Sequence, residues 1–465
     1  MHASHAHSLD GQRILVVGLG RSGLAAARFC ARQGAQVTVN DRRDAAALGA
    51  LLQELPAGVA HELGDHPEAL FVAQDAIVVS PGVPELPALA AAREAGVEIL
   101  GEIELAARHL EADVIGITGT NGKSTVTTWI GEMARGGPRP VFVGGNLGEP
   151  LICALAQPAA GPDGLCVVEL SSFQLETCVA LRPRVALLLN LAEDHLDRYP
   201  DMATYAAAKA RIFGAQKPED WAVVNWDQPA CRELVQGTAA QVAGFGLADP
   251  PPVGATVEGT ELVVRLPHRP TRRFETKDLR LVGRHNLENA AAATLAAVLV
   301  GIEDAPIQRA LQEFRGLPHR MEAVGEVQGV RFYNDSKATN VSAVAGSLSG
   351  FPDPFVWVAG GRHKGSPYRP LRELLTRQAR ALVLIGEAAD RIAADLEGVA
   401  PIERAATLEE AVARAAALAA PGEAVVLSPA CSSYDMFDNF EARGAAFAAA
   451  VAALKARAEH AGGEA

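Results

Sequence analysis

Hydrophobic residues gather in short runs along this chain, and each run ends in Gly, Ser, Asn or an acid. The runs are residues 14–18, 75–80, 113–119, 165–170, 184–190, 354–361, 381–386 and 424–429, with alanine-rich helical stretches between them. This alternation is typical of βαβ units, in which buried parallel strands read as continuous apolar runs. We therefore predict an α/β fold whose ligands bind beyond the carboxyl ends of the strands.

The length of 465 residues favours about three domains. One boundary is expected near residue 102, where strand-like VEILG gives way to helical IELAARHL, and another near 317, between the alanine-rich helix and GLPHRME. We predict domains at 1–102, 103–317 and 318–465. Alternating residues and prolines between 245 and 282 predict a small β segment inside the middle domain.

Composition excludes some partners. Hydrophobic residues make up 49% of the chain and charged residues 21%, a globular balance. The net charge of -13, without any basic run, argues against a nucleic-acid partner. An anionic ligand must therefore be held locally by backbone amides, a few Lys or Arg side chains, or a metal ion.

The cysteines and the apolar segments bear on the compartment. Six scattered cysteines form no CxxC pair, which predicts reduced core thiols. The first ten residues contain no apolar signal segment, and the longest uncharged stretch, around 290–302, is too short to span a bilayer. We expect a cytoplasmic protein without membrane insertion.

A first glycine loop, Gly18-Leu19-Gly20-Arg21-Ser22-Gly23, follows strand ILVV, and Asp41 closes the next strand. This spacing fits a dinucleotide-binding fingerprint. The same geometry suits a UDP-sugar, because glycines admit any pyrophosphate and the acid can bind any ribose or sugar hydroxyl. A tight turn without a ligand is a third reading. Ser80-Pro81-Gly82 follows another strand at the same predicted edge.

A second glycine loop, Thr118-Gly119-Thr120-Asn121-Gly122-Lys123-Ser124-Thr125, lies between an apolar strand and a helix. Its amides are expected to face phosphates, with Lys123 near the terminal ones and the hydroxyl of Ser124 or Thr125 on Mg²⁺. The strict P-loop spacing is not met, because Ile117 stands where that pattern has glycine. The order of strand, loop and helix still predicts a nucleotide phosphate site.

Three further residues are candidate metal ligands or catalysts. Glu169 follows a strand and His195 lies in NLAEDHLDRY, and both are side chains that can ligate Mg²⁺. Each also has an ordinary reading, as a helix-capping acid and as a core or surface histidine. Lys209 lies in the alanine-rich TYAAAKARIF, where the ordinary reading is a lysine with its stem along apolar surface.

Nearly the whole chain resembles the Mur ligase family. The segments that carry the resemblance are GITGTNGKST, VVELSSFQLE, NLAEDHLDRY, GRHNLENAAAA, GLPHRME, NDSKATN and SPACSSYDMFDNFEARG. The phosphate loop and the HNxxN element are shared with folylpolyglutamate synthetases, whereas NDSKATN and the last segment look like the glutamate-adding members. The DNPR-type motif of the diaminopimelate-adding members is not present in this sequence.

The resemblance implies an N-terminal Rossmann-like domain, a central P-loop ATPase-like domain and a C-terminal Rossmann-like domain. It also implies an ATP-dependent ligase, expected to be a monomer, that adds D-glutamate to UDP-N-acetylmuramoyl-L-alanine in peptidoglycan precursor synthesis. The reaction would pass through an acyl phosphate, which the glutamate amine attacks. Positioning and electrostatic stabilisation are expected to supply most of the catalysis.

Carried over by position, the resemblance implies site residues in three groups. Those for the UDP-substrate are Gly18, Gly20, Ser22, Gly23, Asp41, Arg42, Ser80, Gly82, Asn146 and Gln174. Those for ATP are Gly119, Thr120, Asn121, Gly122, Lys123, Ser124, Thr125, Asn286, Asn289, Arg320 and Asp335. Those for glutamate are Lys337, Thr339, Lys364, Ser433 and Phe440.

The implied catalytic residues are Lys123, Glu169, His195, Lys209 and Lys337. Thr125 and Glu169 would serve one Mg²⁺, and His195 and Lys209 a second. Lys209 would be carbamylated, because an ammonium cannot ligate a cation and a carbamate can. Arg42 and the basic loop at 360–365 depart from the family pattern.

Several alternatives stay open on the sequence. The same ligation with L-glutamate and a folylpolyglutamate-synthetase-like activity would share most of these residues. An NAD-dependent oxidoreductase would use the first glycine loop, and a nucleotide-sensing binding protein the second. Each of these last two classes leaves half of the chain unexplained.

Overall fold

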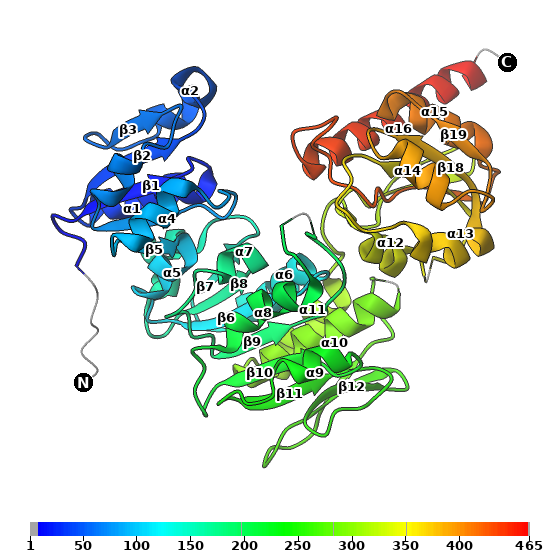
Figure 1. Ribbon diagram of the computed structural model, residues 1–465. Coiled ribbons are helices and arrows are strands. Elements are labelled where there is room, and N and C mark those ends of the chain that lie inside the picture. The colour runs from blue at the N-terminus through cyan, green and yellow to red at the C-terminus, as the bar shows by residue number, and fades with distance from the viewer. Residues whose placement is uncertain (1–7, 197, 282, 350, 464–465) are drawn as a thin grey trace. The chain divides into compact units, whose positions relative to one another are not determined.

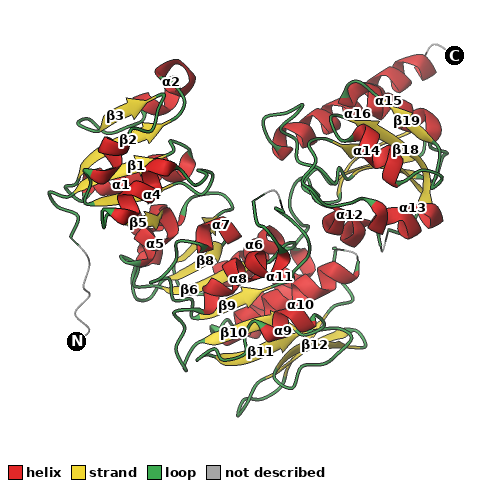
Figure 2. Cartoon of the chain, in the orientation of Figure 1, coloured by secondary structure: helices red, strands yellow, loops and turns green. Residues whose placement is uncertain are grey.

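A computed structural model describes residues 8–196, 198–281, 283–349 and 351–463 of the chain. The described residues form two compact units (Figures 1 and 2). The first comprises Met1–Leu191, Tyr205–Asp278 and Asn289–Gln312, and the second Ala192–Thr204, Leu279–Glu288 and Glu313–Ala465, within those described ranges. Each unit is considered by itself.

The first sheet lies in the first unit and has the order β3-β2-β1-β4-β5, with every pairing parallel. Its strands are β1 (Arg13–Val17), β2 (Gln36–Asp41), β3 (Ala60–Leu63), β4 (Ala76–Val79) and β5 (Glu98–Gly101). Its helices are α1 (Arg21–Arg32), α2 (Ala45–Gln53), α3 (Glu68–Val72), α4 (Pro87–Glu94) and α5 (Glu102–Ala107). The strand order reverses between β1 and β4, which is where such sheets bind ligands.

The two faces of strand β1 pack in different hydrophobic clusters. Ile14 and Val16 pack in a large cluster with α1, whereas Leu15 and Val17 pack with Phe71 of α3. Both faces are therefore covered, as the continuous apolar run predicted.

The second sheet, also in the first unit, has the order β14-β13-β12-β11-β10-β9-β6-β8-β7. Its strands are β6 (Asp113–Thr118), β7 (Val141–Gly145), β8 (Leu165–Glu169), β9 (Val185–Leu188), β10 (Trp221–Asn225), β11 (Gln241–Phe245), β12 (Gly254–Glu258), β13 (Glu261–Arg265) and β14 (Arg272–Glu275). The pairings from β7 to β12 are parallel, and those from β12 to β14 are antiparallel. The small β segment predicted between 245 and 282 is thereby confirmed.

The helices that follow the strands of the second sheet include α6, which begins directly after the second glycine loop. They are α6 (Lys123–Arg135), η1 (Leu151–Ala156), η2 (Pro158–Ala160), α7 (Ser172–Leu175), α8 (Met202–Ala210), η3 (Arg211–Phe213), α9 (Pro229–Glu233), α10 (Arg284–Leu299) and α11 (Asp304–Glu313). The alanine-rich α10 is buried along most of its length.

Helix α5 connects the first two sheets. Glu102 Oε1 accepts a hydrogen bond of 2.7 Å from Ile152 N, and Glu104 Oε2 accepts bonds of 2.8 Å from Val179 N and Ala180 N. Both carboxyl groups are buried. Burial raises the pKa of Glu102 to about 7, against the opposing effect of the Ile152 N–H.

The third sheet lies in the second unit, with the order β15-β16-β20-β17-β18-β19. Its strands are β15 (Glu322–Val327), β16 (Val330–Asn334), β17 (Phe355–Gly360), β18 (Ala379–Ile385), β19 (Ile402–Arg404) and β20 (Ala424–Leu427), and its helices are α12 (Val341–Leu348), η4 (Arg369–Leu371), α13 (Arg372–Gln378), α14 (Ala389–Asp395), α15 (Leu408–Leu418) and α16 (Phe440–Gly463). Only the β15–β16 pairing among these described strands is antiparallel. Helices α12, α13 and α14 cover one face, and α15 and α16 cover the other (Figure 1).

All the apolar runs singled out in the sequence form strands, and the α/β class with three sheets is confirmed. All six cysteines are free thiols, five of them buried and Cys153 partly exposed. Among the described residues, no helix has both the length and the apolar character needed to cross a membrane.

Candidate active site

The first glycine loop joins β1 to α1 and depends on close backbone packing. Gly18 has φ of 87°, and a side chain there would meet Val83 at 2.8 Å, whereas one at Gly23 would meet the Gly18 carbonyl oxygen at 2.0 Å. Ser80 Oγ donates a 2.7 Å hydrogen bond to that same carbonyl. The loop after β1 is thus fastened to the end of β4.

Asp41 holds this loop from the end of β2. Its Oδ2 accepts a 2.7 Å hydrogen bond from Leu19 N, and Arg43 donates to both carboxylate oxygens. Burial alone favours the neutral acid, but the hydrogen bonds from Arg43 and from the backbone of Arg43 and Leu19 lower the pKa of Asp41 to about 2. The sequence did not single out Arg43, because nothing in its spacing shows that it folds back onto Asp41.

Two other glycines of this region have open space where a side chain would be. At Gly20 and Gly82, no described atom lies within 4 Å of an added Cβ. Packing therefore gives no reason for glycine at either position, and the free space admits a ligand next to the backbone. Arg42 is exposed beside this loop, and Ser22 lies in the first turn of α1.

The second glycine loop is held by Asn190, which follows β9. Asn190 O accepts from Thr120 N at 3.0 Å, and the Asn190 amide exchanges hydrogen bonds of 2.8 and 3.0 Å with the backbone of Asn121. These contacts orient the loop before helix α6 begins. Asn190 could have been suspected only from its place at the carboxyl end of a strand.

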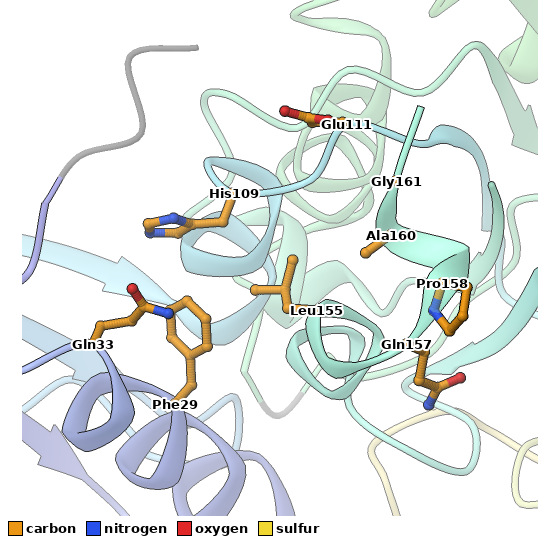
Figure 3. Close-up of a pocket in the computed structure, with 9 residues that line it drawn as sticks. All are labelled: Phe29, Gln33, His109, Glu111, Leu155, Gln157, Pro158, Ala160 and Gly161. Atoms are coloured by element: carbon orange, nitrogen blue, oxygen red, sulfur yellow. The ribbon is translucent and has the colours of Figure 1, made fainter. Parts of the chain in front are cut away.

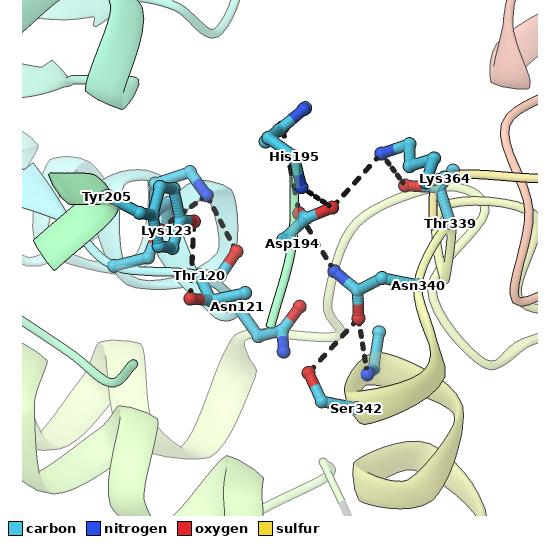
Figure 4. A network of polar contacts seen from close by, with 12 residues as sticks. Thr120, Asn121, Lys123, Asp194, His195, Tyr205, Thr339, Asn340, Ser342 and Lys364 are labelled. Carbon is cyan, nitrogen blue, oxygen red and sulfur yellow. Dashed lines mark hydrogen bonds and ion pairs between the residues drawn. The ribbon is translucent and has the colours of Figure 1, made fainter. Parts of the chain in front are cut away.

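Lys123, Ser124 and Thr125 are the first residues of α6, so their backbone N–H groups belong to a helix N-terminus. Lys123 Nζ donates 2.8 Å hydrogen bonds to the carbonyls of Gly119 and Thr120 (Figure 4). The hydroxyl residues Ser124 and Thr125 are buried. The arrangement is suited to holding a chain of phosphates.

Gly122 caps α6 and approaches Asn289 of α10. Its φ is 82°, and a Cβ there would lie 2.4 Å from Asn289 Oδ1. Asn289, which is buried, therefore contacts the second glycine loop from a distant part of the chain. This places one predicted ATP-site residue of the HNxxN element against the others.

Glu169 ends β8 with a buried carboxylate. Its Oε1 accepts a 2.8 Å hydrogen bond from Asn146 Nδ2, while Oε2 is buried and has no hydrogen-bond partner among the described residues. A buried oxygen of this kind is suited to a cation. Gln174 lies nearby in sequence, where it completes a capping box with Ser171 at the start of α7.

Helix α8 supports the second glycine loop with two side chains one turn apart. Lys209 Nζ donates a 2.9 Å hydrogen bond to Gly119 O, and Tyr205 Oη lies 3.3 Å from Thr120 Oγ1. Lys209 is 1% exposed, and its Nζ lies 4.6 Å from the centre of the Tyr205 ring. The interpretation of Lys209 as a surface lysine is therefore wrong.

In the second unit, the loop that carries His195 contacts the loop after β16 (Figure 4). Asn340 Nδ2 donates to Asp194 Oδ2 at 3.1 Å, and Lys364 Nζ lies 3.4 Å from Asp194 Oδ1 and 3.5 Å from Thr339 Oγ1. His195 has φ of 55°, and its ring lies 3.7 Å from Asp194 Oδ2. Asp194, which the sequence did not single out, joins predicted metal and glutamate residues.

Two predicted glutamate-site residues meet at the start of α16. Lys337 Nζ lies 3.6 Å from the centre of the Phe440 ring, a cation–π contact. Ser433 is buried in the loop after β20. Lys337, Ser433 and Phe440 therefore belong to one side of the third sheet, at the carboxyl ends of β16 and β20.

The remaining predicted ATP-site residues of the second unit are Asn286, Arg320 and Asp335. Asp335 is buried after β16, and its carboxylate accepts hydrogen bonds from Ser428 Oγ at 2.8 Å and Met321 N at 3.3 Å. Burial raises the pKa of Asp335 to about 6, although hydrogen bonds from Ser428 and Ser347 and the charge of Arg320 oppose this.

No three His, Cys, Asp or Glu side chains within the described ranges form a metal-ligand cluster. The predicted ligand sets include only one such residue each, Glu169 and His195, so they depend on Thr125, a carbamate and substrate oxygens as well. Thr125, Glu169 and Lys209 belong to the first unit and His195 to the second. Their roles remain predictions.

A separate cavity of about 420 Å³ lies between α1 and the η1–η2 segment (Figure 3). Its lining residues are Phe29, Gln33, His109, Glu111, Leu155, Gln157, Pro158, Ala160 and Gly161. None of them is a predicted site residue. The cavity therefore does not belong to the site described above.

Three family comparisons cover most of the chain. Residues 12–101 match the Mur ligase MurD-like N-terminal domain, residues 117–297 the Mur ligase middle domain, and residues 319–431 the Mur ligase glutamate ligase domain. Among solved structures, UDP-N-acetylmuramate-alanine ligase MurC from Thermotoga maritima has a TM-score of 0.61 at 18% identity, covering 96% of this chain and 100% of that one. That likeness shows the fold.

Curated relatives are more similar to this chain in sequence than that solved structure is. The UDP-N-acetylmuramoylalanine–D-glutamate ligase of Anaeromyxobacter dehalogenans is 48% identical over 457 residues, covering 95% of this chain and 98% of the relative. The protein of the same name from Geobacter metallireducens is 48% identical over 451 residues, covering 96% and 98%. Together with the three matching domain models, these relatives show that the chain belongs to the Mur ligase family.

Proposed function

We propose that this protein is an ATP-dependent ligase that joins D-glutamate to UDP-N-acetylmuramoyl-L-alanine in peptidoglycan precursor synthesis. Support comes from the relatives of that name at 48% identity over almost the full chain. The structural observation that carries the proposal is the glycine loop at α6, fastened by Asn190 and Lys209 and carrying Lys123. The six free thiols support a reducing, cytoplasmic location.

The first glycine loop and the end of β4 are proposed to bind the UDP-substrate. The open space at Gly20 and Gly82 supports this, because backbone N–H groups at the start of α1 can then approach a pyrophosphate. Asp41 holds the loop in shape through Leu19 N. Ser22, Arg42, Ser80, Asn146 and Gln174 are proposed to complete the site.

The second glycine loop, with Asn286, Asn289, Arg320 and Asp335, is proposed to bind ATP. Lys123 can move from the loop carbonyls of Gly119 and Thr120 to phosphate oxygens, exchanging neutral acceptors for charged ones. This exchange favours bound ATP. It also places a positive charge where the γ-phosphate leaves.

Magnesium is proposed to accompany ATP, with Thr125 and Glu169 at one site and His195 and Lys209 at another. The unpartnered Oε2 of Glu169 fits a hard cation. When bound, Mg²⁺ neutralises phosphate charge during transfer. For Lys209, the deprotonated amine would attack the carbon of CO₂ and lose a proton, which leaves a carbamate with two oxygens. The remaining N–H would still donate to Gly119 O.

Lys337, Thr339, Lys364, Ser433 and Phe440 are proposed to bind glutamate. Two lysines in one site can pair with its two carboxylates. The phosphoryl group of ATP passes to the carboxylate of the muramoyl-alanine, and ADP leaves. The neutral glutamate amine then attacks the acyl carbon, loses a proton and expels phosphate, so that an amide bond replaces the acyl phosphate. Positive charge from Lys337 and Lys364 stabilises the tetrahedral intermediate.

We also propose domain limits at 1–102, 103–317 and 318–465. The end of β5 at Gly101 with α5 beginning at Glu102, and the start of β15 at Glu322, support these limits. Each domain would then carry most of the proposed residues for one of the three substrates. Closure of the three domains would exclude water from the acyl phosphate.

The test is phosphate release from ATP with UDP-N-acetylmuramoyl-L-alanine and a panel of amino acids. We expect release only when D-glutamate is also present. Release with L-glutamate instead would mean that the L-isomer is the substrate, and release with a folate acceptor would indicate a folylpolyglutamate synthetase. Slow, acceptor-independent turnover would indicate a nucleotide switch, and a change in NADH fluorescence an oxidoreductase.

A further inference from the structure

Arg443, in the first turn of α16, is a buried arginine that none of the roles above uses. Its side chain is 1% exposed. The Nε atom donates to Ser336 Oγ at 3.0 Å, Nη2 to Ser336 O at 2.9 Å, and the two terminal nitrogens to Cys431 O at 3.2 Å. Nη1 also donates to Ser432 O at 3.3 Å. Every acceptor is an uncharged oxygen.

No ion pair joins Arg443 to a carboxylate in the part of the chain that the structure describes. Asp435 is near enough to favour its charge but forms no hydrogen bond or ion pair with it, and Asp435 Oδ2 instead accepts from Glu387 N at 3.0 Å. Burial lowers the pKa of Arg443 to about 10, so the guanidinium stays charged at neutral pH. A fully buried and uncompensated charge is expensive, and folds keep one rarely.

The acceptors of Arg443 belong to the segments that carry the proposed glutamate residues. Ser336 precedes Lys337 directly, and Ser432 precedes Ser433. Ser336 Oγ, which accepts from Arg443, donates to Phe440 O at 2.8 Å. One planar guanidinium therefore fixes the positions of the loop after β16, the loop after β20 and the start of α16.

Such a bridge requires arginine in particular. Five N–H groups in a rigid plane reach acceptors from three segments at once, because Nη1 also donates to Gly360 O, at the end of β17, at 3.5 Å. A lysine ammonium has only three donors on a flexible stem. The positive charge of Arg443 contacts the carbonyl oxygens of Cys431 and Ser432, which directly precede the proposed glutamate-site residue Ser433. Asp435 favours this charge without forming an ion pair with it, so part of the charge is available to an anion that enters.

We propose that Arg443 is a positioning residue that sets both the affinity for the incoming amino acid and its preference for a second carboxylate. Through its hydrogen bonds it holds Lys337, Ser433 and Phe440 in place. Through its buried charge, which has no ion-pair partner among the described residues, it favours an acidic amino acid over the neutral amide of the same shape. This inference rests on the proposed function, and names the feature of that site that selects a dicarboxylate.

The test compares Arg443→Gln and Arg443→Lys with Arg457→Gln, an exposed arginine on the same helix, as the matched control. KM is measured for D-glutamate, ATP and the UDP-substrate, and D-glutamine is assayed as a competing acceptor. For Arg443→Gln we expect the D-glutamate KM to rise at least about tenfold, the loss of hydrogen bonds from a charged donor. The KM for the UDP-substrate should stay within about twofold, because its proposed residues share no contact with Arg443. The KM for ATP should rise less than that for D-glutamate, because Asp335 adjoins Ser336 but does not itself bond Arg443.

The second variant, Arg443→Lys, distinguishes the effect of the positive charge from the effect of the hydrogen bonds. Arg443→Lys keeps the charge, so it should keep the preference for D-glutamate over D-glutamine while losing part of the affinity. Arg443→Gln should lose both. An unchanged glutamate KM in Arg443→Gln, or an equal rise of all three KM values in both variants, would overturn the proposal. A wild-type protein without D-glutamate-dependent phosphate release would instead refute the proposed function.

Discussion

Lys209 Nζ and Gly119 O are joined by a 2.9 Å hydrogen bond, which fastens helix α8 to the phosphate loop. The same helix contacts Thr120 through Tyr205. The lysine is buried, so its amine lies against the second glycine loop and not at the protein surface. A carbamate on this nitrogen would retain the N–H that makes the bond.

If Lys209 works as a carbamate, Lys209→Ala should be inactive and partly restored by acetate or formate, and more weakly by chloride. A small carboxylate supplies the charge and the oxygens that the carbamate would provide, whereas an ammonium repels divalent cations. Phosphate release with and without added carboxylate measures this.

Lys217→Ala is a suitable control, since Lys217 is an exposed lysine of the same unit. It should behave as wild type and show no response to acetate. Substantial activity of Lys209→Gln without added carboxylate would show that the carbamate is not needed.

Lys123→Ala should reduce phosphate release at least about 100-fold, comparable with removing a transition-state electrostatic donor. The fold should remain intact, because the hydrogen bonds from Lys123 Nζ to Gly119 O and Thr120 O lie within a single loop and its adjoining helix. Turnover and the thermal unfolding midpoint measure the two effects. Near-normal turnover would exclude this loop as the ATP site.

Asp41→Ala should weaken binding of UDP-N-acetylmuramoyl-L-alanine by about tenfold or more, the loss of charge-assisted hydrogen bonds. ATP binding should change little, because the loop proposed to bind ATP follows β6, a strand of the second sheet. Calorimetric Kd values for both ligands test this. The low pKa of Asp41 keeps it charged above about pH 4, so the difference should not vary between pH 5 and pH 9.

Asp75→Ala is the matched control for Asp41. Asp75 also binds an arginine, Arg13, but at the opposite end of β1 and at the surface. It should leave both Kd values unchanged. Equal losses for the two ligands in Asp41→Ala would mean that the first glycine loop has been misassigned.

Glu102→Gln should stabilise the first unit at pH 8 and not at pH 4.5. The pKa of Glu102 is raised from 4.5 to about 7, so the folded state holds the proton more tightly than the unfolded state. The free energy of unfolding therefore falls as the pH rises from about 4.5 to about 7, by on the order of 3 kcal/mol. Glutamine retains an oxygen that accepts from Ile152 N, and because it does not titrate, it removes this loss of stability at high pH. Urea unfolding at both pH values measures it.

Glu104→Gln should act in the opposite direction. Both oxygens of Glu104 have donors, from Arg108, Val179 and Ala180, so the charge is satisfied and its removal should destabilise the unit. A Glu102→Gln variant whose stability follows the pH exactly as wild type does would rule out Glu102 as the titrating group.

Local patterns in the sequence were enough to predict the strands and both glycine loops. The apolar runs are fully buried strands, and such runs are clear because both faces of a parallel sheet are covered. The turn at Gly122 follows from its place between a strand and a helix. Its contact with Asn289 does not, because α10 reaches it only through the tertiary fold.

The residues that the sequence missed act through contacts between distant segments. Asn190, Asp194 and Arg443 each bond a backbone or side chain outside their own motif. Burial of a polar side chain cannot be read from residue spacing, and for this reason Lys209 also had an ordinary reading as a lysine with its stem along apolar surface. The resemblance to a family supplied positions for the site, but not the hydrogen bonds that hold it.

The antiparallel end of the second sheet has a consequence for the behaviour of the protein at high concentration. The last strand, β14, carries Arg272 and Arg273, which form ion pairs with Asp304 and with Glu258 and Glu261. Charged side chains on a short outer strand discourage another chain from adding to it. We therefore expect little association through β14 at high protein concentration. Replacing both arginines with valine should promote strand-to-strand aggregation without changing the structure of the two glycine loops.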